Sequence, residues 1–226
     1  MTELLYTISV WLLPLVFAIT FHEVAHGWVA GRLGDDTAMR AGRVTLNPLK
    51  HVDNFGTLML PGLLILVSAP FVFGYAKPVP VNFARLNNPK RDMVWVALAG
   101  PAMNIALAIV AGLLFHLRPF FPAFASPWIL DNLDHMLLIN VILAVFNMLP
   151  LPPLDGGRVL VGILPRPLAV RVARVERYGM LLLIGVLFIV PTVSSYLGYP
   201  FSPLVWLMGT PIELTFDFIL AVSGHG

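Results

Sequence analysis

The sequence has no cysteine and little charge: 12% of its 226 residues are Asp, Glu, Lys or Arg, whereas 58% are hydrophobic. Without cysteine there is no disulfide scaffold and no thiolate ligand for a metal. A soluble domain carries about 25% charged residues, and a globule of this length could not hide such an apolar surplus from water. The net charge of +2 is too small a bias to indicate a nucleic-acid partner. The composition therefore predicts an integral membrane protein surrounded by a lipid bilayer.

Long apolar runs are the main feature of the chain. A helix needs about 20 mainly apolar residues to cross the hydrocarbon core. Six runs approach that length, namely residues 4–30, 55–75, 93–117, 133–149, 178–196 and 204–222. The second run contains Pro61-Gly62 and Ala69-Pro70, so we expect it to be re-entrant or broken. We predict an all-α polytopic membrane protein with about five full transmembrane helices, folded as a single domain over residues 1–226.

Two polar stretches flank the second run. Residues 37–46 have Gly42 near their centre, which favours a short hairpin. Residues 77–91 contain Pro78 and Pro80, which disfavour a helix because proline lacks the N–H and restricts the residue before it. We expect short strands in the first stretch and extended or looped chain in the second.

The first apolar run ends in an HExxH pattern formed by His22, Glu23 and His26. Residues four apart share one face of a helix, so both imidazoles can bind one metal ion while Glu23 lies beside it. Ionisable groups inside a bilayer are costly and tend to mark function. A bound metal ion would offset that cost. The alternative interpretation is that the two histidines only cap the helix end at the membrane interface.

A zinc site of this kind needs a third protein ligand and leaves its fourth position for water. We interpret the other four histidines as interfacial residues: His51, His116, His135 and His225. A carboxylate is the better candidate, and Asp155 stands between a proline-rich segment and two glycines. Irregular backbone at membrane depth is tolerated only where it is buried in protein or lines a wet cavity. The alternative is a helix-ending loop in which Asp155 pairs with Arg158.

Two asparagines of the apolar runs are placed suggestively. Asn104 is inside the third run, and Asn147 is near the end of the fourth, eight positions before Asp155. An amide in an apolar helix can hold helices together, or it can donate a hydrogen bond to a developing oxyanion. The first role is favoured for Asn104, and both roles stay open for Asn147. Both are candidate substrate-binding residues.

The metal ligands constrain the topology. If His22, His26 and Asp155 bind one ion, they lie at the same depth, and an even number of crossings separates them. A second run that does not cross the membrane meets this condition. It also puts the three basic stretches on one side: residues 32–54, 77–91 and 158–177. The positive-inside rule makes that side cytoplasmic. We therefore predict a multi-pass protein of the cell membrane with its site toward the cytoplasmic face, its N-terminus outside and its C-terminus inside.

Three segments together resemble the site-2 protease family of intramembrane zinc metalloproteases (peptidase family M50). They are Phe21-His-Glu-Val-Ala-His26, Gly100-Pro-Ala-Met-Asn104, and the stretch from Asn147 to Asp155-Gly156-Gly157. The resemblance implies one Zn²⁺ per chain held by His22, His26 and Asp155. It also implies that Glu23 is the catalytic base and that Asn147 assists oxyanion or substrate binding.

The same resemblance implies a transmembrane protein as substrate, cut within or next to one of its helices. It places a catalytic core at about residues 4–165 and C-terminal helices at about 176–222. Residues 42–46 or 77–82 correspond to a membrane-associated β-strand region that can hold an unwound substrate. Many relatives carry a PDZ or CBS domain, and this chain looks like a minimal form with neither.

Two other functional classes use the same three ligands. A metal-ion transporter would tolerate Glu23→Gln, but it would also line a path with polar groups, of which the last two apolar runs have few. A metal-binding membrane scaffold would need no Glu23 at all. The intact HExxH pattern favours the protease. The sequence makes no prediction of oligomeric state.

Overall fold

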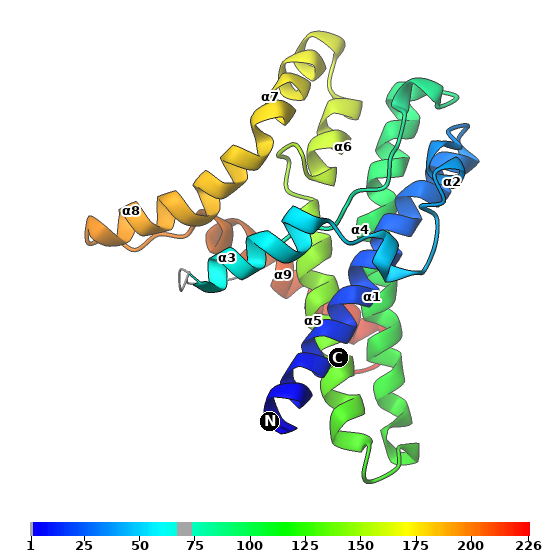
Figure 1. Cartoon of the computed structure of the whole chain (residues 1–226), viewed down its shortest axis with the longest axis vertical. Coiled ribbons are helices and arrows are strands. Elements are labelled where there is room, and N and C mark those ends of the chain that lie inside the picture. Colours follow the sequence, from blue (N-terminus) through cyan, green and yellow to red (C-terminus); the bar gives the residue numbers. More distant parts are fainter. Residues whose placement is uncertain (1, 67–73) are drawn as a thin grey trace.

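Most of the residues that the structure describes are helical (Figure 1). The computed structural model describes residues 2–66 and 74–226. Its α-helices are α1 (Thr2–Arg32), α2 (Thr37–Arg40), α3 (Leu60–Leu66), α4 (Pro89–Leu114), α5 (Ser126–Asn147), α6 (Asp155–Ile163), α7 (Arg166–Ile184), α8 (Val190–Tyr196) and α9 (Pro203–Val222). Short 3₁₀ turns form at Pro48–Lys50, Phe83–Arg85 and Phe115–Phe120, and π-helical turns at Asn54–Met59 and Gly185–Ile189.

Five helical stretches among the described residues are long and apolar enough to cross a membrane. They are Glu3–Arg32, Pro89–Phe120, Ser126–Asn147, Arg166–Tyr196 and Pro203–Val222. A helix satisfies its own backbone hydrogen bonds, which hydrocarbon cannot do, so apolar runs of this length fold as helices. The prediction of an all-α multi-pass protein is confirmed, with five helical stretches of membrane-spanning length and composition.

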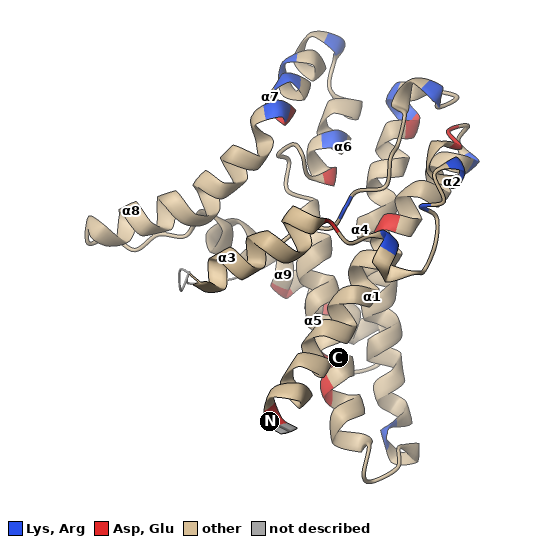
Figure 2. Cartoon of the chain, viewed as in Figure 1, with Lys and Arg blue, Asp and Glu red and all other residues tan. Residues whose placement is uncertain are grey.

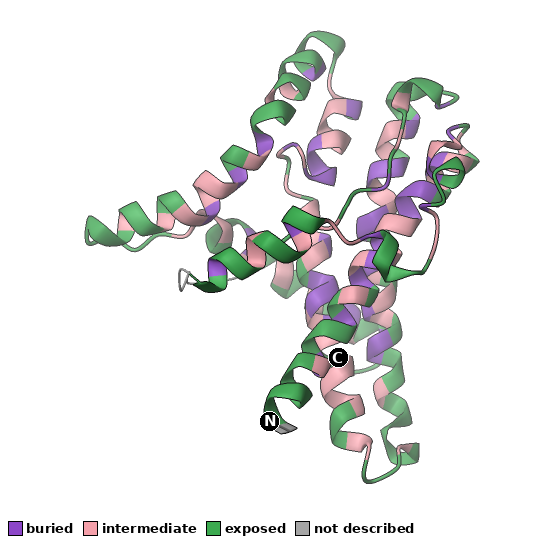
Figure 3. Ribbon diagram, viewed as in Figure 1, coloured by how far each residue is buried: buried purple, intermediate pink, exposed green. Residues whose placement is uncertain are grey.

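Helices α1, α4 and α5 pack together as the centre of the molecule, and α6 and α9 pack against α4. Small side chains on α4, Ala108 and Ala111, allow close contact with Val141 of α5 and Ile219 of α9, and all four are essentially inaccessible. Figure 3 shows that buried residues concentrate where α1, α4, α5 and α6 meet, whereas α3 and α8 are mostly exposed. The interior of the protein is therefore small and lies around α4.

The described ends of the second apolar run lie side by side. A π-helical turn and α3 carry the chain away, and Tyr75 then donates its N–H to the Gly56 carbonyl at 3.0 Å. The Thr57 hydroxyl donates to the Tyr75 carbonyl at 2.9 Å. The two ends of the run thus lie together, as a re-entrant or broken segment requires. Part of this run, residues 67–73, lies outside the described residues.

The predicted β-strands are absent from residues 2–66 and 74–226, so that expectation was wrong. Residues 37–40 form α2, and the chain then turns through Gly42 with φ +63°. Residues 77–82 are extended but pair with no strand, because Pro78 and Pro80 lack an N–H. The N–H groups of Lys77, Val79 and Asn82 find other acceptors, which are described with the site below.

The carboxyl end lies elsewhere than predicted. His116, in the 3₁₀ turn that follows α4, donates through Nε2 to the Ser223 carbonyl at 2.7 Å, and its ring stacks on His225 at 4.4 Å. The C-terminus therefore sits at the end of α4 that is remote from the basic loops. A C-terminus on the inside requires the fifth and sixth apolar runs to be two complete crossings in opposite directions. In the structure α9, which contains the sixth run, runs alongside α4 in the same direction, so the fifth run does not make a complete crossing.

The two ends of the molecule differ in their content of basic residues. Lys and Arg gather where α1 ends and where α4 and α7 begin, as Figure 2 shows. This distribution agrees with the prediction that the basic stretches share one side.

Candidate metal centre

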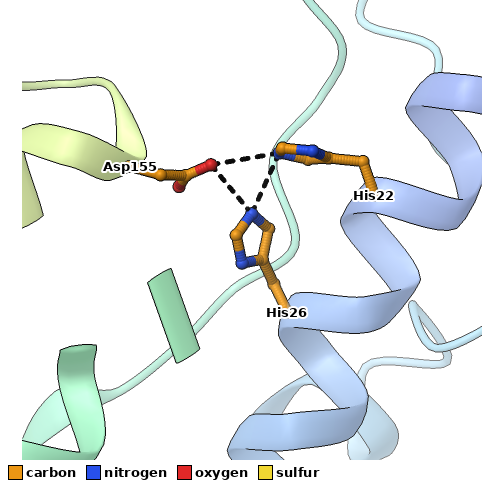
Figure 4. Close-up of side chains that lie close together, drawn as sticks. All are labelled: His22, His26 and Asp155. Atoms are coloured by element: carbon orange, nitrogen blue, oxygen red, sulfur yellow. Dashed lines mark hydrogen bonds and ion pairs between the residues drawn. The ribbon is translucent and has the colours of Figure 1, made fainter. Parts of the chain in front are cut away.

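Two residues of α1 and the first residue of α6 bring three ligating atoms together (Figure 4). His22 Nε2 lies 3.0 Å from His26 Nε2 and 3.1 Å from Asp155 Oδ2. His26 Nε2 lies 3.2 Å from the same carboxylate oxygen. All three residues are buried. Among the residues that the structure describes, this is the group of histidines and carboxylates that could hold a metal ion.

Helix α4 fixes both imidazoles through their other nitrogens. His26 Nδ1 donates to the Val96 carbonyl at 2.7 Å, and His22 Nδ1 donates to Asn104 Oδ1 at 2.6 Å. Gly100 lies between these two acceptors, and a Cβ there would stand 2.4 Å from His26 Nε2 and 2.6 Å from His22 Nε2. Positions 96, 100 and 104 repeat every four residues, as do 22 and 26. One ridge of α4 therefore matches one ridge of α1.

Two glycines place Asp155 at the start of α6. A Cβ at Gly156 would lie 2.2 Å from the Met148 carbonyl oxygen, and a Cβ at Gly157 would lie 2.3 Å from the Pro152 nitrogen. Any side chain at these positions would push α6 away from the loop that leads into it. Because both positions are glycine, α6 starts directly against that loop, and its first residue reaches the two histidines.

The three converging atoms need a positive charge between them. With both Nδ1 atoms donating, each neutral imidazole presents a lone pair at Nε2. The third atom, Asp155 Oδ2, is buried and accepts no hydrogen bond. Three acceptors at 3.0–3.2 Å would repel one another without a shared cation. Tetrahedral zinc with bonds of about 2.0–2.2 Å spaces its ligands about 3.3–3.6 Å apart, so a shift of a few tenths of an ångström fits the ion.

Glu23 is held by an extended segment that crosses α1. Its Oε2 accepts the N–H of Val79 at 2.7 Å. The neighbouring donors of this segment are also satisfied: Lys77 N–H by the His51 carbonyl at 2.9 Å, and Asn82 N–H by Asp35 Oδ2 at 2.6 Å. These bonds replace the strand pairing that the sequence predicted. They also fix one carboxylate oxygen of Glu23, which neighbours both candidate ligands of α1 in the HExxH motif.

Asp35 anchors this segment from the end of α1. Its carboxylate accepts hydrogen bonds from Thr37 and from the Asn82 N–H, and Arg85 lies 3.9 Å away. Burial would raise the pKa of the Asp35 carboxyl, but these hydrogen bonds outweigh it and hold the pKa below its ordinary value of 3.8. Asp35 is therefore an ionised anchor at neutral pH.

The other predicted site residues lie close by in different settings. Asn147 is the last residue of α5, and its Nδ2 donates to the Leu143 carbonyl of its own helix at 3.0 Å. Asn104 is fully buried and contacts His22. A substrate-binding role for either residue stays a prediction. Arg158 lies 3.7 Å from Glu176, so the alternative pairing of Arg158 with Asp155 is not formed.

Sequence reasoning missed two features of the site. One is Asn140 of α5, fully buried and hydrogen-bonded to Asn104 at 2.8 Å. Its signal was present, because it is a third amide in an apolar run and lies seven residues, about two turns, before Asn147. The other is the Val79 backbone N–H, which carries no side-chain signal at all.

Comparison with known proteins agrees with this geometry. The family model of peptidase family M50 matches residues 10–127 and 123–190. The chain belongs to peptidase family M50. The matched range holds all three ligating residues, Glu23 and both candidate asparagines, so the resemblance noted from the motifs is confirmed.

Curated relatives from distant organisms match this M50 peptidase over most of its length. YwhC of Bacillus subtilis is 38% identical over 192 residues, covering 83% of each chain. Rip2 of Mycobacterium tuberculosis (strain H37Rv) is 32% identical over 201 residues, covering 88% of this chain and 71% of its own. MJ0611 of Methanocaldococcus jannaschii is 31% identical over 160 residues, covering 69% and 72%. Their names assign them, provisionally, to the zinc metalloproteases. No solved structure matches the chain.

Proposed function

We propose that this M50 peptidase hydrolyses peptide bonds within or next to transmembrane helices of other membrane proteins, with one Zn²⁺ per chain. The observation that carries the proposal is the convergence of His22, His26 and Asp155 beside Glu23 at the end of a membrane-length helix. The names of YwhC, Rip2 and MJ0611 support zinc as the metal. Two imidazoles and a carboxylate are a ligand set used by zinc peptidases.

Zinc bound to these ligands would supply a Lewis acid that polarises the scissile carbonyl and lowers the pKa of water at the site. The chain supplies the proton transfers. Glu23 takes a proton from the attacking water on its carboxylate and delivers it to the leaving amine nitrogen. The Val79 N–H holds Oε2, so the carboxylate keeps one orientation while it exchanges that proton.

Binding of a transmembrane substrate requires local unwinding, because a helix otherwise keeps its peptide bonds engaged in its own hydrogen bonds. Asn147 ends α5 at the loop that leads to Asp155, where an unwound stretch of substrate would meet the ligands. In this proposal its amide turns from the Leu143 carbonyl toward the oxyanion of the tetrahedral intermediate. Residues 77–82 offer an extended backbone beside the carboxylate of Glu23.

The proposed setting is the cell membrane, with the site toward the cytoplasmic face. Clustering of Lys and Arg at the end of the molecule near the site supports this orientation (Figure 2). Residues 1–226 act as a single domain in this proposal, with the catalytic core at about 4–165 and the C-terminal helices at about 176–222.

The proposal is tested by comparing the wild type with Glu23→Gln in detergent. We expect one zinc per chain in both proteins, because Glu23 is not a ligand. The rate of cleavage of a membrane-protein substrate should fall by about 10²–10⁴-fold in Glu23→Gln, the contribution typical of a general base. Metal content is read by elemental analysis, and cleavage by mass spectrometry of the products.

A matched variant, Glu213→Gln, changes a carboxylate on α9 far along the chain from the HExxH motif, and it should leave both quantities unchanged. Full activity in Glu23→Gln would overturn the assignment of the base. A wild type that binds no zinc under conditions that preserve the fold would overturn the metal centre itself.

A further inference from the structure

A chain of amides leads away from the metal centre through three helices. Asn104 Oδ1 accepts from His22 Nδ1, and Asn104 Nδ2 donates to Asn140 Oδ1 at 2.8 Å. Asn140 Nδ2 then donates to the Met136 carbonyl of α5 at 2.7 Å. Asn104 and Asn140 are both fully inaccessible. Two asparagines in an apolar interior are costly unless each hydrogen bond serves a purpose.

The Met136 carbonyl, at the end of this series of hydrogen bonds, determines which group donates and which accepts in each of them. A backbone carbonyl can only accept, so the Met136 oxygen requires an N–H from Asn140. The amide oxygen of Asn140 must then face Asn104 and accept from its Nδ2. Asn104 consequently presents its own oxygen to His22, which must carry its proton on Nδ1. The lone pair of His22 Nε2 is left for the metal.

The two histidines differ in how their proton is fixed. His26 Nδ1 faces the backbone carbonyl of Val96, which is part of α4 and cannot rotate to present a donor instead. His22 faces a side-chain amide, which presents either an acceptor or a donor depending on its rotation by 180°. That rotation is opposed only by the groups that bind the Asn104 amide nitrogen. They are Asn140 Oδ1 at 2.8 Å and, less closely, the Ala18 carbonyl at 3.2 Å.

We propose that Asn140 is a positioning residue for the metal centre, which acts through Asn104 to keep His22 in the Nδ1–H form that binds metal through Nε2. Groups behind a metal-binding histidine set its tautomer and ring orientation, and their loss typically lowers metal affinity about 10–100-fold. Asn140 lies one step further from the metal than such a group. The proposal rests on the zinc centre put forward above.

The first experiment compares Asn140→Leu with Asn132→Leu. Both asparagines lie on α5 and donate from Nδ2 to the carbonyl four residues earlier, Asn132 at 2.8 Å to Trp128. They are about 12 Å apart along the helix axis, so only Asn140 can reach Asn104. We expect zinc affinity, measured by competition with a chelator, to fall about 10-fold in Asn140→Leu and to stay unchanged in Asn132→Leu. Unchanged affinity in Asn140→Leu would overturn the proposal.

A double substitution tests whether Asn140 acts through Asn104. In Asn104→Leu the acceptor for His22 is lost, and we expect affinity to fall toward the upper end of the 10–100-fold range. Adding Asn140→Leu to that protein should cost nothing more, because no amide remains to be oriented. Losses that multiply in the double variant would show independent structural effects and would contradict the proposal.

A measurement on the wild type does not depend on variants that fold. In metal-free protein labelled with ¹⁵N-histidine, at a pH well above the ordinary histidine pKa of about 6.5, the ring-nitrogen shifts report the tautomer of His22. We expect Nδ1–H. An Nε2–H signal for His22 would overturn the proposal even if zinc binding is intact. Conversely, a protein that binds no zinc but shows Nδ1–H would contradict the proposed function. It would still support the control of the His22 tautomer by Asn140 through Asn104.

Discussion

The bundle of α1, α4, α5 and α6 differs from the three helices α7, α8 and α9 in what it buries. In the most apolar window of each span, 33% of residues are buried in α4 and its extension but only 11% in α9. Within the described chain, the buried polar and charged side chains run from Thr20 to Asp155, with Ser223 the exception. The first region, α1, α4, α5 and α6, thus encloses buried polar groups between apolar helices. The second region, α7, α8 and α9, mainly presents apolar surface to lipid.

This difference shows where sequence changes matter. In the first region His22, His26, Asn104 and Asn140 are hydrogen-bonded to groups on neighbouring turns and helices, so an added methyl group or a lost amide disturbs a network. In the second region side chains such as Val205 and Trp206 are more than 70% exposed. Lipid can cover them in many arrangements. The predictions below compare substitutions in the two regions, beginning with the change of largest expected effect.

Gly100→Ala should abolish metal binding. The new methyl group would stand 2.4–2.6 Å from the ligating nitrogens of His22 and His26, so the rings or α4 must move away. We expect zinc content to fall from about one per chain to near zero and cleavage to fall by at least about 10²-fold, the usual effect of a 1 Å misplacement. Elemental analysis and the cleavage assay measure both.

Gly209→Ala in α9 is the matched control from the second region. A Cβ at Gly209 would meet nothing within 4 Å. The change should alter thermal stability by no more than about 1 kcal/mol, the helix propensity difference between the two residues, with zinc content unchanged. Equal effects of the two glycine substitutions would contradict the contrast between the regions.

Asn147→Ala should separate catalysis from metal binding. If the amide stabilises the oxyanion, kcat should fall by about 10²–10³-fold. Zinc content and stability should stay near those of the wild type, because the Asn147 amide bonds only to the backbone of its own helix. Single-turnover cleavage at saturating substrate is the measurement. A change confined to KM would assign the residue to substrate binding rather than to the oxyanion.

Among the changes in the first region, Asp35→Asn should have the smallest effect, and one that depends on pH. Hydrogen bonds to a charged group are worth about 1.5–3 kcal/mol, so the variant should unfold at lower temperature at pH 7. Because the folded pKa lies below 3.8, the stabilisation is complete well above that pH and is lost as pH falls through the folded pKa. The difference between wild type and variant should therefore begin to shrink near pH 4 and disappear only once the pH is below the folded pKa. A constant difference across this range would show that charge is not involved.

The three residues of the candidate metal centre, which the structure brings together, could be named from the sequence because their signals are local. The four-residue spacing of His22 and His26 is a helix property. Asp155 follows prolines that prevent a regular helix and precedes two glycines that allow close approach of the backbone. Asn140 was missed because its partner, Asn104, is 36 positions away, and nothing in a single sequence pairs two amides on different helices. The contact of Glu23 with the Val79 N–H is a backbone interaction and has no sequence signature.

The fold was readable to the level of helices but not of their directions or irregular segments. Membrane helices follow from apolar length alone, which is why the five spans were found. The stretch around Val79 was expected to be a strand region because the resemblance to the site-2 protease family implied one. Here carboxylates and a carbonyl accept its N–H groups instead. The C-terminus was misplaced because crossing parity assumes that each long apolar helix traverses the full membrane.

The matched ridges of α1 and α4 have a consequence for assembly. His22 and His26 meet Asn104, Gly100 and Val96 at a common interval of four residues, so a slide of one helix along the other by a single residue would misalign every pairing at once. In the proposed zinc-bound form, an ion held by His22, His26 and Asp155 would therefore require these two helices to be in register. A nascent chain able to retain zinc would already have its first and third apolar runs in register.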